Sequence, residues 1–437
     1  MQRYSIHVAY HNPGGTVTLM KDRENLTKSM RVGYLAAGIF ALSLIIRLIA
    51  NSYLSDTLHA PLSGDEPTYV NIALNLLSGS GYSMNGVDPT AFRAPGYPLF
   101  LVVVLFLTGK SLLLARIVNI LIGSATVVVV LLAGEKMFDR TTALIASLLL
   151  SIYPVFVGIS GELISDTLFV FLMCAFLLMM AMAGDNARSP WTMLGAGLFL
   201  GWALVTRAEL IVFFPFLVVW SYYHFRKSGA VGRVLIFLLL PAMCFAVPWV
   251  YRNYQMYGKF TMTTGVGAVA WGVHNPGTFG DWTLMGGWYP PKDSLLSNAG
   301  ERLPALRNPA GTYLPESEWD KQLLARSIQS IKANIRSMPK MEIYKLRLLF
   351  ASPGAVESLV RFPLFFFFFF GMTVSLIHRD RRHTILYVFL AFPLVITLIL
   401  YTDPRLRMAA DVVFLLVGSY GLLNYLQWIR SKPGTPG

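Results

Sequence analysis

Charged residues are scarce in this sequence of 437 residues. Asp, Glu, Lys and Arg together account for 14% of it, against about 25% in ordinary soluble proteins, whereas hydrophobic residues account for 55%. A soluble enzyme is therefore disfavoured. Apolar runs such as 112–133 and 167–183 approach the roughly 20 residues that a helix needs to cross a bilayer. Because several such runs follow one another, we expect a chain that crosses the membrane many times.

Cysteine is almost absent, and no glycine-rich phosphate loop is present. Cys174 and Cys244 each lie inside an apolar run, and their positions fit neither a disulfide framework nor a zinc cluster. No P-loop or dinucleotide-binding pattern occurs, which disfavours a nucleotide-sugar substrate. The first 32 residues are polar and have no apolar core followed by a cleavage site. We therefore expect residues 1–32 to be cytoplasmic and the first span to be the anchor.

The formal net charge is +13, which could indicate a nucleic-acid or anionic partner. The Lys and Arg residues, however, stand mostly in short loops between apolar runs. Cytoplasmic loops of membrane proteins carry an excess of these residues. Topology and phosphate binding therefore explain the charge better, and no nucleic-acid partner is expected.

The apolar runs predict an all-α polytopic membrane protein, a bundle of about 10–11 transmembrane helices. The run 95–108 is ambiguous, because a run of about 14 residues is often re-entrant or interfacial. If it does not cross, the basic segments 224–233 and 378–383 both lie in the cytoplasm. The other ten expected spans are 33–51, 112–134, 141–158, 164–184, 191–206, 208–222, 233–250, 360–377, 384–400 and 411–428.

This topology places every segment with chemical content on the extracytoplasmic side. The long polar stretch 251–344 contains tryptophans and a helical part near 316–347, so we expect a structured cap rather than a disordered loop. The predicted organisation is a cytoplasmic segment 1–32, a transmembrane module 33–250 with a first outer loop 52–94, the cap 251–344, a second transmembrane module 345–428 and a cytoplasmic tail 429–437.

Acidic residues mark the first candidate site. Asp65 and Glu66 are adjacent in the first outer loop, where they can supply a general base, a divalent-cation site, or both; a helix N-terminus, which also favours acids, is the alternative. Glu162 and Asp166 are four residues apart and would share a helix face at the mouth of a span. His274 could contact a metal or substrate, although a lone loop histidine is more often structural.

Arginines supply the opposite charge. Arg207, Arg252, Arg405 and Arg407 lie at the expected outer ends of spans, against the positive-inside tendency, and Arg93 stands in "AFRAPGYPLF". Several arginines at outer ends, rather than one, indicate a bound anion, and the planar guanidinium group suits phosphate oxygens. Snorkelling toward lipid headgroups is the alternative for any single arginine. In an extended segment, Arg405 and Arg407 would point the same way.

Four segments resemble the bacterial and archaeal relatives of the protein O-mannosyltransferases and aminoarabinose transferases, in the GT-C superfamily. They are "GDEPTY", "AFRAPGYPLF" with the later "EKMFDRTTALIASLLLSIYPVFVGISGELISDTLF", "PWVYRNYQMYGKFTMTTGVG" and "DPRLRM". Together they cover most of residues 60–275 and the region near 405. The relatives' late basic motif usually continues into prolines, and here "RLRMAAD" has none.

The resemblance implies a role for each acid. Asp65 would take the proton from the acceptor hydroxyl, Glu66 would assist, and Asp166 would be the second acid of the site. Some members of the family bind a divalent cation such as Mg, Mn, Zn or Ca, for which Asp65 and Asp166 would be the ligands here.

The resemblance also implies the donor. Arg405, Arg407, Arg252 and Arg93 would hold the phosphate of a polyprenyl-phosphate sugar as it leaves. We therefore predict a mannosyltransferase-like glycosyltransferase of the plasma (inner) membrane, which moves a monosaccharide to a lipid, glycan or protein acceptor of the cell envelope. Its site would be extracytoplasmic, and the reaction would be a single displacement with inversion at the anomeric carbon.

Two other functions remain open from the sequence. A ligase or polymerase that moves lipid-linked oligosaccharides would also have a large outer loop with arginines. A transporter of an anionic substrate would carry intramembrane charges, but internal repeats and interrupted helices are common in transporters and are not evident here. The adjacent acids of the first loop favour the monosaccharide transferase.

Overall fold

The computed structural model describes residues 33–184, 187, 189–281, 283–289, 314–351, 355–403 and 405–431. Within these ranges the regular structure is helical, apart from an isolated bridge between Ser83 and Pro89. The predicted cytoplasmic segment 1–32, residues 290–313 of the cap and the end of the tail lie outside the described residues. The all-α fold expected from the apolar runs is confirmed.

Eight helical segments of the described chain are long and apolar enough to cross a membrane. Three shorter apolar helices accompany them, and these are α3 (Gly96–Leu107), α5 (Arg140–Ile152) and α8 (Pro190–Thr206). Two of the ten expected spans, 141–158 and 191–206, correspond to the short helices α5 and α8. The ambiguous run 95–108 corresponds to the third short helix, α3. The long segments are Gly33–Leu54, Leu112–Met137 (α4), Ser165–Ala183 (α7), Ala208–Ser228 (containing α9, Phe213–Phe225), Val231–Tyr257 (α10), Glu357–His378 (in α15, Ala355–His378), Arg381–Ile399 (containing α16, Thr384–Ile399) and Met408–Arg430 (α17).

Polar side chains begin several of these helices. Ser111 accepts a hydrogen bond from the Leu114 amide at the start of α4, and Asp139 accepts from the amides of Thr141 and Thr142 at the start of α5. Such caps satisfy backbone N–H groups that have no partner in the first turn. The short breaks between consecutive helices are therefore fixed by the local sequence.

Glycines allow two pairs of helices to pack closely. A Cβ atom added at Gly197 of α8 would lie 2.0 Å from the Phe237 carbonyl oxygen of α10. One added at Gly421 of α17 would lie 1.8 Å from the Phe367 carbonyl oxygen of α15. Small residues at helix contacts are typical of membrane bundles, where close backbone approach replaces the hydrophobic effect as the source of stability.

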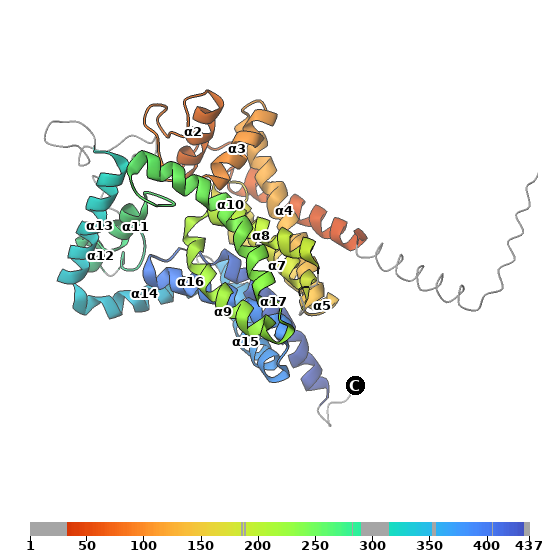
Figure 1. The fold of residues 1–437 in the computed structure, drawn as a ribbon. Helices are drawn as coiled ribbons and strands as arrows, with labels where there is room; N and C mark the ends of the chain where they lie inside the picture. Colours follow the sequence, from red (N-terminus) through yellow and green to blue (C-terminus); the bar gives the residue numbers. More distant parts are fainter. Residues whose placement is uncertain are drawn as a thin grey trace, which may run out of the picture.

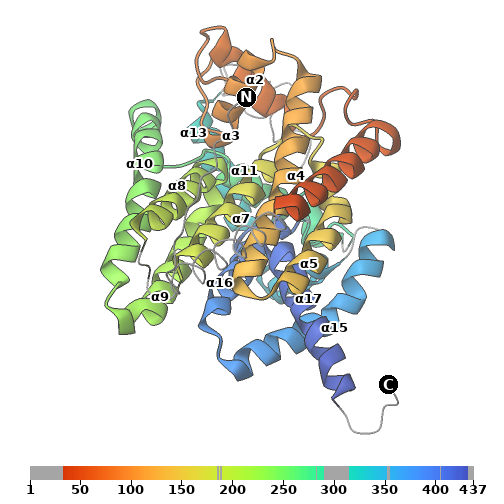
Figure 2. The ribbon, with the colours of Figure 1, turned by 90° about the vertical axis from the view of Figure 1, so that its right-hand side faces the viewer.

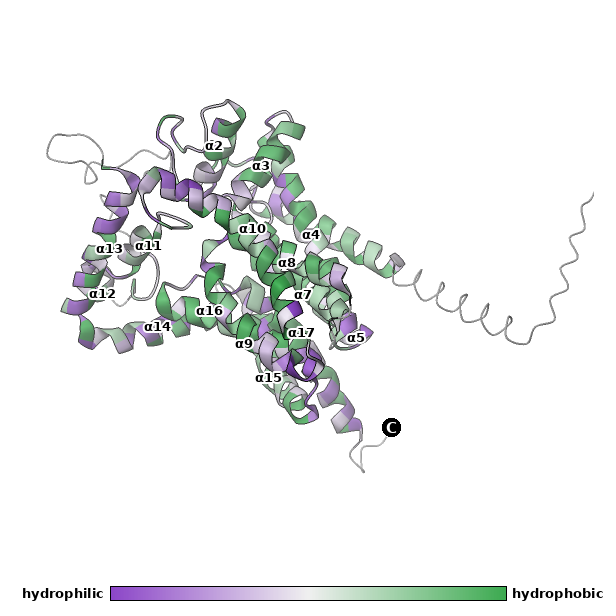
Figure 3. Cartoon of the chain, in the orientation of Figure 1, coloured by the Kyte–Doolittle hydropathy of each residue, from purple (hydrophilic) through white to green (hydrophobic). Residues whose placement is uncertain are grey.

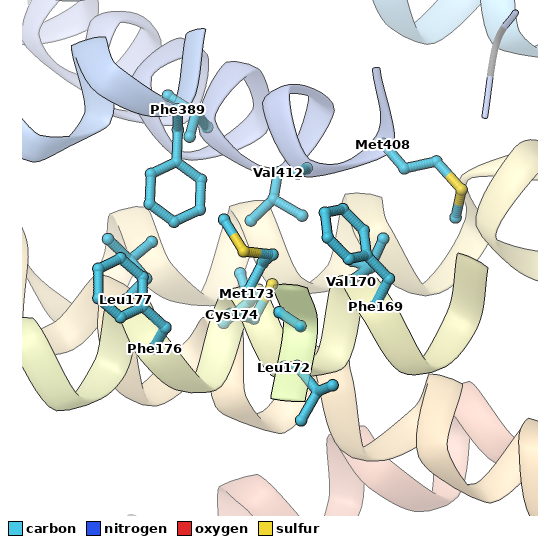
Figure 4. Packing of buried hydrophobic residues seen from close by; sticks show 14 of the residues in the cluster. Phe169, Val170, Leu172, Met173, Cys174, Phe176, Leu177, Phe389, Met408 and Val412 are labelled. Atoms are coloured by element: carbon cyan, nitrogen blue, oxygen red, sulfur yellow. The ribbon is translucent and has the colours of Figure 1, made fainter. Parts of the chain in front are cut away.

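Helix α7 lies in the interior of the bundle, where it contacts α4, α8 and α17 (Figures 1 and 2). Phe169, Met173 and Phe176 of α7 are buried and face Phe389 of α16 and Val412 of α17 (Figure 4). This packing fixes the N-terminal end of α7, where Asp166 stands.

The cap lies to one side of the bundle, next to the end of α10 (Figure 1). We take the cap to include all of α14, which continues past the predicted boundary at 344. The cap then contains α11 (Val266–Val273), α12 (Pro276–Gly280), α13 (Glu316–Ala333) and α14 (Met338–Phe350), and its exposed helices are more hydrophilic than the spans (Figure 3). The helical part predicted near 316–347 is formed by α13 and α14. Glu316 ties the cap to the first loop, since it accepts hydrogen bonds from the Thr90 hydroxyl and the Ala91 amide.

Candidate functional site

Charged groups from segments far apart in the sequence line one cavity of about 480 Å³. Its volume lies within the range of about 300–1,000 Å³ typical of small-molecule sites. One wall is apolar, with residues such as Ile211, Ile396 and Ile399. The charged lining consists of three carboxylates and three guanidinium groups, which belong to Asp65, Asp166, Glu209, Arg93, Arg207 and Arg405.

Asp65 joins two arginines across the cavity. It stands at the N-cap of α2 (Glu66–Leu77), yet its side chain makes no capping hydrogen bond. Instead, Oδ1 accepts from Arg93 and Oδ2 accepts from Arg405 Nη1 at 3.0 Å. The Arg93 guanidinium, aided by that of Arg405, holds the pKa of Asp65 well below its usual range, although desolvation acts in the opposite direction. Asp65 is therefore ionised at neutral pH and already occupied by two cations.

Glu66, the neighbour of Asp65, has a different environment. Its side chain is buried and does not line the cavity. It pairs with Arg116 at 3.0 Å and accepts hydrogen bonds from the amides of Ser63 and Leu163. Because consecutive residues at a helix start point in different directions, only one of the two adjacent acids can face the cavity. The assisting catalytic role predicted for Glu66 has no support in this geometry, which makes it a residue that ties the first loop to the turn before α7.

Asp166 stands in the first turn of α7 and pairs with Arg207, which also bonds Glu209 at 2.6 Å. Arg207 was among the arginines expected at outer ends, but it was not assigned to the phosphate set. The structure adds it to the cavity together with Glu209, Tyr69 and Tyr401. Arg207 could have been predicted as a site residue from its position at the expected outer end of a span. Nothing in the local sequence distinguishes the two tyrosines as residues of the cavity.

Two predicted phosphate ligands lie away from the cavity lining. Arg252 donates to the Thr90 carbonyl at 2.7 Å and covers the Trp249 ring at 4.7 Å. Arg407 is buried, pairs with Glu357 and Asp411, and donates to the carbonyl of Leu349. These placements do not support the predicted roles.

The divergence of Arg405 and Arg407 has a backbone cause. They would point the same way in an extended segment, but the Met408 amide donates to the Arg405 carbonyl at 3.3 Å and the Asp411 amide donates to the Arg407 carbonyl at 2.8 Å. The segment therefore turns into α17 at this point. Arg405 faces the cavity, whereas Arg407 enters the helix bundle.

Glu162 lies in the turn before α7, where its carbonyl accepts from the Asn119 side chain at 2.6 Å. Burial raises the pKa of its carboxyl group to about 7, and the nearby charge of Arg405 opposes this shift. The carboxylates of Glu66, Asp166 and Asp65 raise the pKa further. Glu162 does not line the cavity, but its charge interacts with those of Arg405 and Asp65, which do.

The arrangement does not fit the divalent cation expected at Asp65 and Asp166. Both carboxylates are already paired with guanidinium groups. Among the residues that the structure describes, no group of three or more His, Cys, Asp or Glu side chains could hold a metal ion. In this geometry the two acids are partners of arginines rather than metal ligands.

Comparison with solved structures defines the class of fold. The oligosaccharyltransferase AglB of Archaeoglobus fulgidus, in complex with an inhibitory peptide and dolichol-phosphate, matches with a TM-score of 0.55 at 12% identity, covering 93% of this chain and 52% of that one. Its complex with Zn and sulfate matches with a TM-score of 0.56 at 13% identity, covering 90% and 49%. The chain therefore shares the fold of AglB, and it spans about half the length of that protein.

A family model narrows the similarity. The model described as dolichyl-phosphate-mannose-protein mannosyltransferase matches residues 92–251, so the resemblance predicted from the sequence is confirmed. ArnT from Cupriavidus metallidurans, bound to undecaprenyl phosphate, is 16% identical with a TM-score of 0.41, covering 94% of this chain and 82% of that one. No curated protein matches the chain.

Proposed function

We propose that this protein is a glycosyltransferase that moves a monosaccharide from a polyprenyl-phosphate donor to a lipid, glycan or protein acceptor at the extracytoplasmic face of the membrane. The observation that carries the proposal is Asp65, a carboxylate between Arg93 and Arg405 in a cavity with an apolar wall. The same cavity thus offers an acid, two cations for a phosphate and a surface for a lipid chain. The dolichol-phosphate in the AglB complex supports a donor of this chemical class.

The reaction follows from these groups. The acceptor oxygen forms a bond to the anomeric carbon while the bond from that carbon to the phosphate oxygen breaks, and the electron pair of that bond leaves with the phosphate. Attack on the face opposite the leaving group gives inversion. Asp65 takes the acceptor proton, and Arg405 with Arg93 stabilises the charge that develops on the phosphate, since preorganised donors in a shielded site are effective there. Asp166, fixed by Arg207, orients the sugar.

The two arginines serve two partners in turn. Before the donor arrives, they hold Asp65. When the donor phosphate binds, it competes for the same guanidinium groups, and Asp65 loses part of the charge that depresses its pKa. The carboxylate therefore becomes a better base at the stage when a donor is present. The family resemblance and the Zn in one AglB complex keep dependence on a divalent cation as a prediction, but no step of the proposed reaction uses a cation, because Asp65 and Asp166 are paired with arginines.

The experiment that tests the function is transfer of radiolabelled sugar by the purified protein from a panel of polyprenyl-phosphate monosaccharides, with membrane lipid extract as the acceptor source. Transfer from one donor would support the proposal and identify the sugar. If a folded protein transfers sugar from none of these donors but does so from a lipid-linked oligosaccharide, the glycan ligase alternative is correct.

We expect the transfer rate to rise with pH through about 7, following the ionisation of Glu162. Below this pH the Glu162 carboxyl is neutral. Above it, the added negative charge increases the basicity of Asp65, and a change of one pKa unit in the base corresponds to at most about a tenfold change in rate. The Glu162→Gln variant should lose this rising limb. The exposed variant Asp56→Asn should keep it, and an unchanged profile in Glu162→Gln would remove Glu162 from the proton chemistry.

A further inference from the structure

Lys345 of α14 is fully buried, although it lies in the cap and away from the cavity lining. Its ammonium group has three acceptors around it. They are Glu342 Oε1 at 3.0 Å, His274 Nε2 at 3.4 Å and the Leu398 carbonyl oxygen at 3.5 Å. A buried lysine is costly unless it is paired, so this arrangement requires three different segments to stay together.

His274 is arranged to accept from Lys345. Its Nδ1 lies 3.1 Å from the Ala270 carbonyl oxygen, which can only accept a hydrogen bond. The ring proton therefore sits on Nδ1, and the lone pair of Nε2 faces the ammonium group. Burial, together with the charge of Lys345, lowers the pKa of His274 to about 4, so the ring is neutral. The sequence favoured a structural role for this histidine, and in the structure its partner in that role is Lys345.

The third acceptor connects Lys345 to the cavity. Helix α16 ends at Ile399, and the last carbonyl groups of a helix have no partner within it. A cation there satisfies a carbonyl group and interacts favourably with the helix dipole. The chain then continues into a segment that we call the arm, residues 400–403 and 405–407. Tyr401 and Arg405 of the arm line the cavity.

A second contact joins the cap to the same arm. The Thr402 amide lies 3.5 Å from the Gly286 carbonyl oxygen. Gly286 has a φ of +85°, and a Cβ atom added to it would lie 3.0 Å from the Lys345 backbone nitrogen. The cap backbone therefore passes directly against Lys345 at a position that favours glycine. Both contacts lie within seven residues of Arg405.

We propose that Lys345 is a positioning residue for the donor site, which holds the arm so that Arg405 reaches Asp65. Lys345 touches no cavity group itself, and it acts through the end of α16. The expected effect on binding of the donor phosphate rests on the proposed function. The link between Lys345 and the position of the arm is independent of that function.

The test compares Lys345→Met, which keeps an unbranched apolar stem and removes the ammonium group, with Lys340→Met on the exposed side of α14. Hydrogen exchange of the full chain in nanodiscs should become faster in the arm of Lys345→Met, while α4 and α7 keep their protection. Binding of undecaprenyl phosphate should weaken about tenfold, by loss of the Arg405 contact. The Lys340→Met variant should match the wild type in both measurements.

A double variant separates positioning from general destabilisation. If Lys345 acts through Arg405, then adding Lys345→Met to Arg405→Lys should weaken binding by less than about twofold, because coupled sites are not additive. Additive losses would overturn the proposal, as would wild-type arm exchange in a folded Lys345→Met.

If Lys345→Met does not fold, His274→Ala removes one acceptor and should give smaller changes in the same direction. A wild type that binds no lipid phosphate would refute the proposed function, while arm exchange would still decide the role of Lys345.

Discussion

Replacing Asp65 with asparagine is expected to lower transfer about 1,000-fold or more and, at the same time, to tighten the binding of polyprenyl phosphate. The first effect follows because general-base groups typically contribute about 10²–10⁴-fold to a rate. The second follows because Asp65 occupies both Arg93 and Arg405, which are the groups proposed to bind the phosphate. A neutral amide would release them. Transfer is measured with the donor found in the panel, and binding is measured with undecaprenyl phosphate.

The opposite signs of the two effects make this variant informative. If Asp65 only maintained the fold, Asp65→Asn would weaken transfer and binding together. If it held a cation that in turn held the phosphate, binding would also weaken. The control is Asp56→Asn, an exposed acid near the same loop with a φ of 48° that asparagine tolerates well. Undiminished transfer by Asp65→Asn would remove this residue from the mechanism.

Replacing Arg407 with leucine is expected to cost about 3–5 kcal/mol of stability. It removes the closer counter-charge of two buried carboxylates and leaves them with Arg361, which lies 3.6 Å from one and 3.9 Å from the other. Glu357 and Asp411 both pair with Arg407 and are themselves buried within the helix bundle. The apparent melting temperature of the purified protein should fall by roughly 5–10 °C. Arg430→Leu, at the exposed far end of the same helix, should leave it unchanged.

The comparison with Arg405 decides between structure and binding. We expect Arg405→Leu to keep most of the melting temperature and to lose undecaprenyl phosphate binding, since Arg405 and its partner Asp65 are only partly buried and line the cavity. An Arg407→Leu protein with a normal melting temperature and no lipid binding would restore the phosphate role that the sequence suggested for Arg407.

Much of the fold could be predicted because membrane spans depend on composition over about 20 residues, and composition is visible in one sequence. For the same reason, composition does not decide whether the three shorter helices cross the membrane, since each has fewer than 18 residues. For the site, only some of the predicted residues line the cavity. Asp65, Asp166, Arg93 and Arg405 were predicted and line one cavity.

The remaining predicted residues depended on side-chain direction, which local sequence does not determine. Glu66 and Arg407 each stand one or two residues from a group that lines the cavity, but the helix starts at these places turn them into the bundle. Arg252 is held by a carbonyl of the first loop, a contact between residues 162 positions apart. The role proposed for Lys345 could not be predicted, because two of its three partners, His274 and Leu398, belong to other segments that only the tertiary fold brings to it.

The two ion pairs of Asp65 also concern the order in which the protein is made. Arg93 follows Asp65 by 28 residues, whereas Arg405 follows it by 340. A nascent chain that has inserted its first spans therefore has Asp65 and Arg93 but lacks the second cation. One arginine of the proposed anion site is thus present early in synthesis, and the other follows α16 in the chain. On the proposed function, binding of the lipid phosphate would require that synthesis has passed α16.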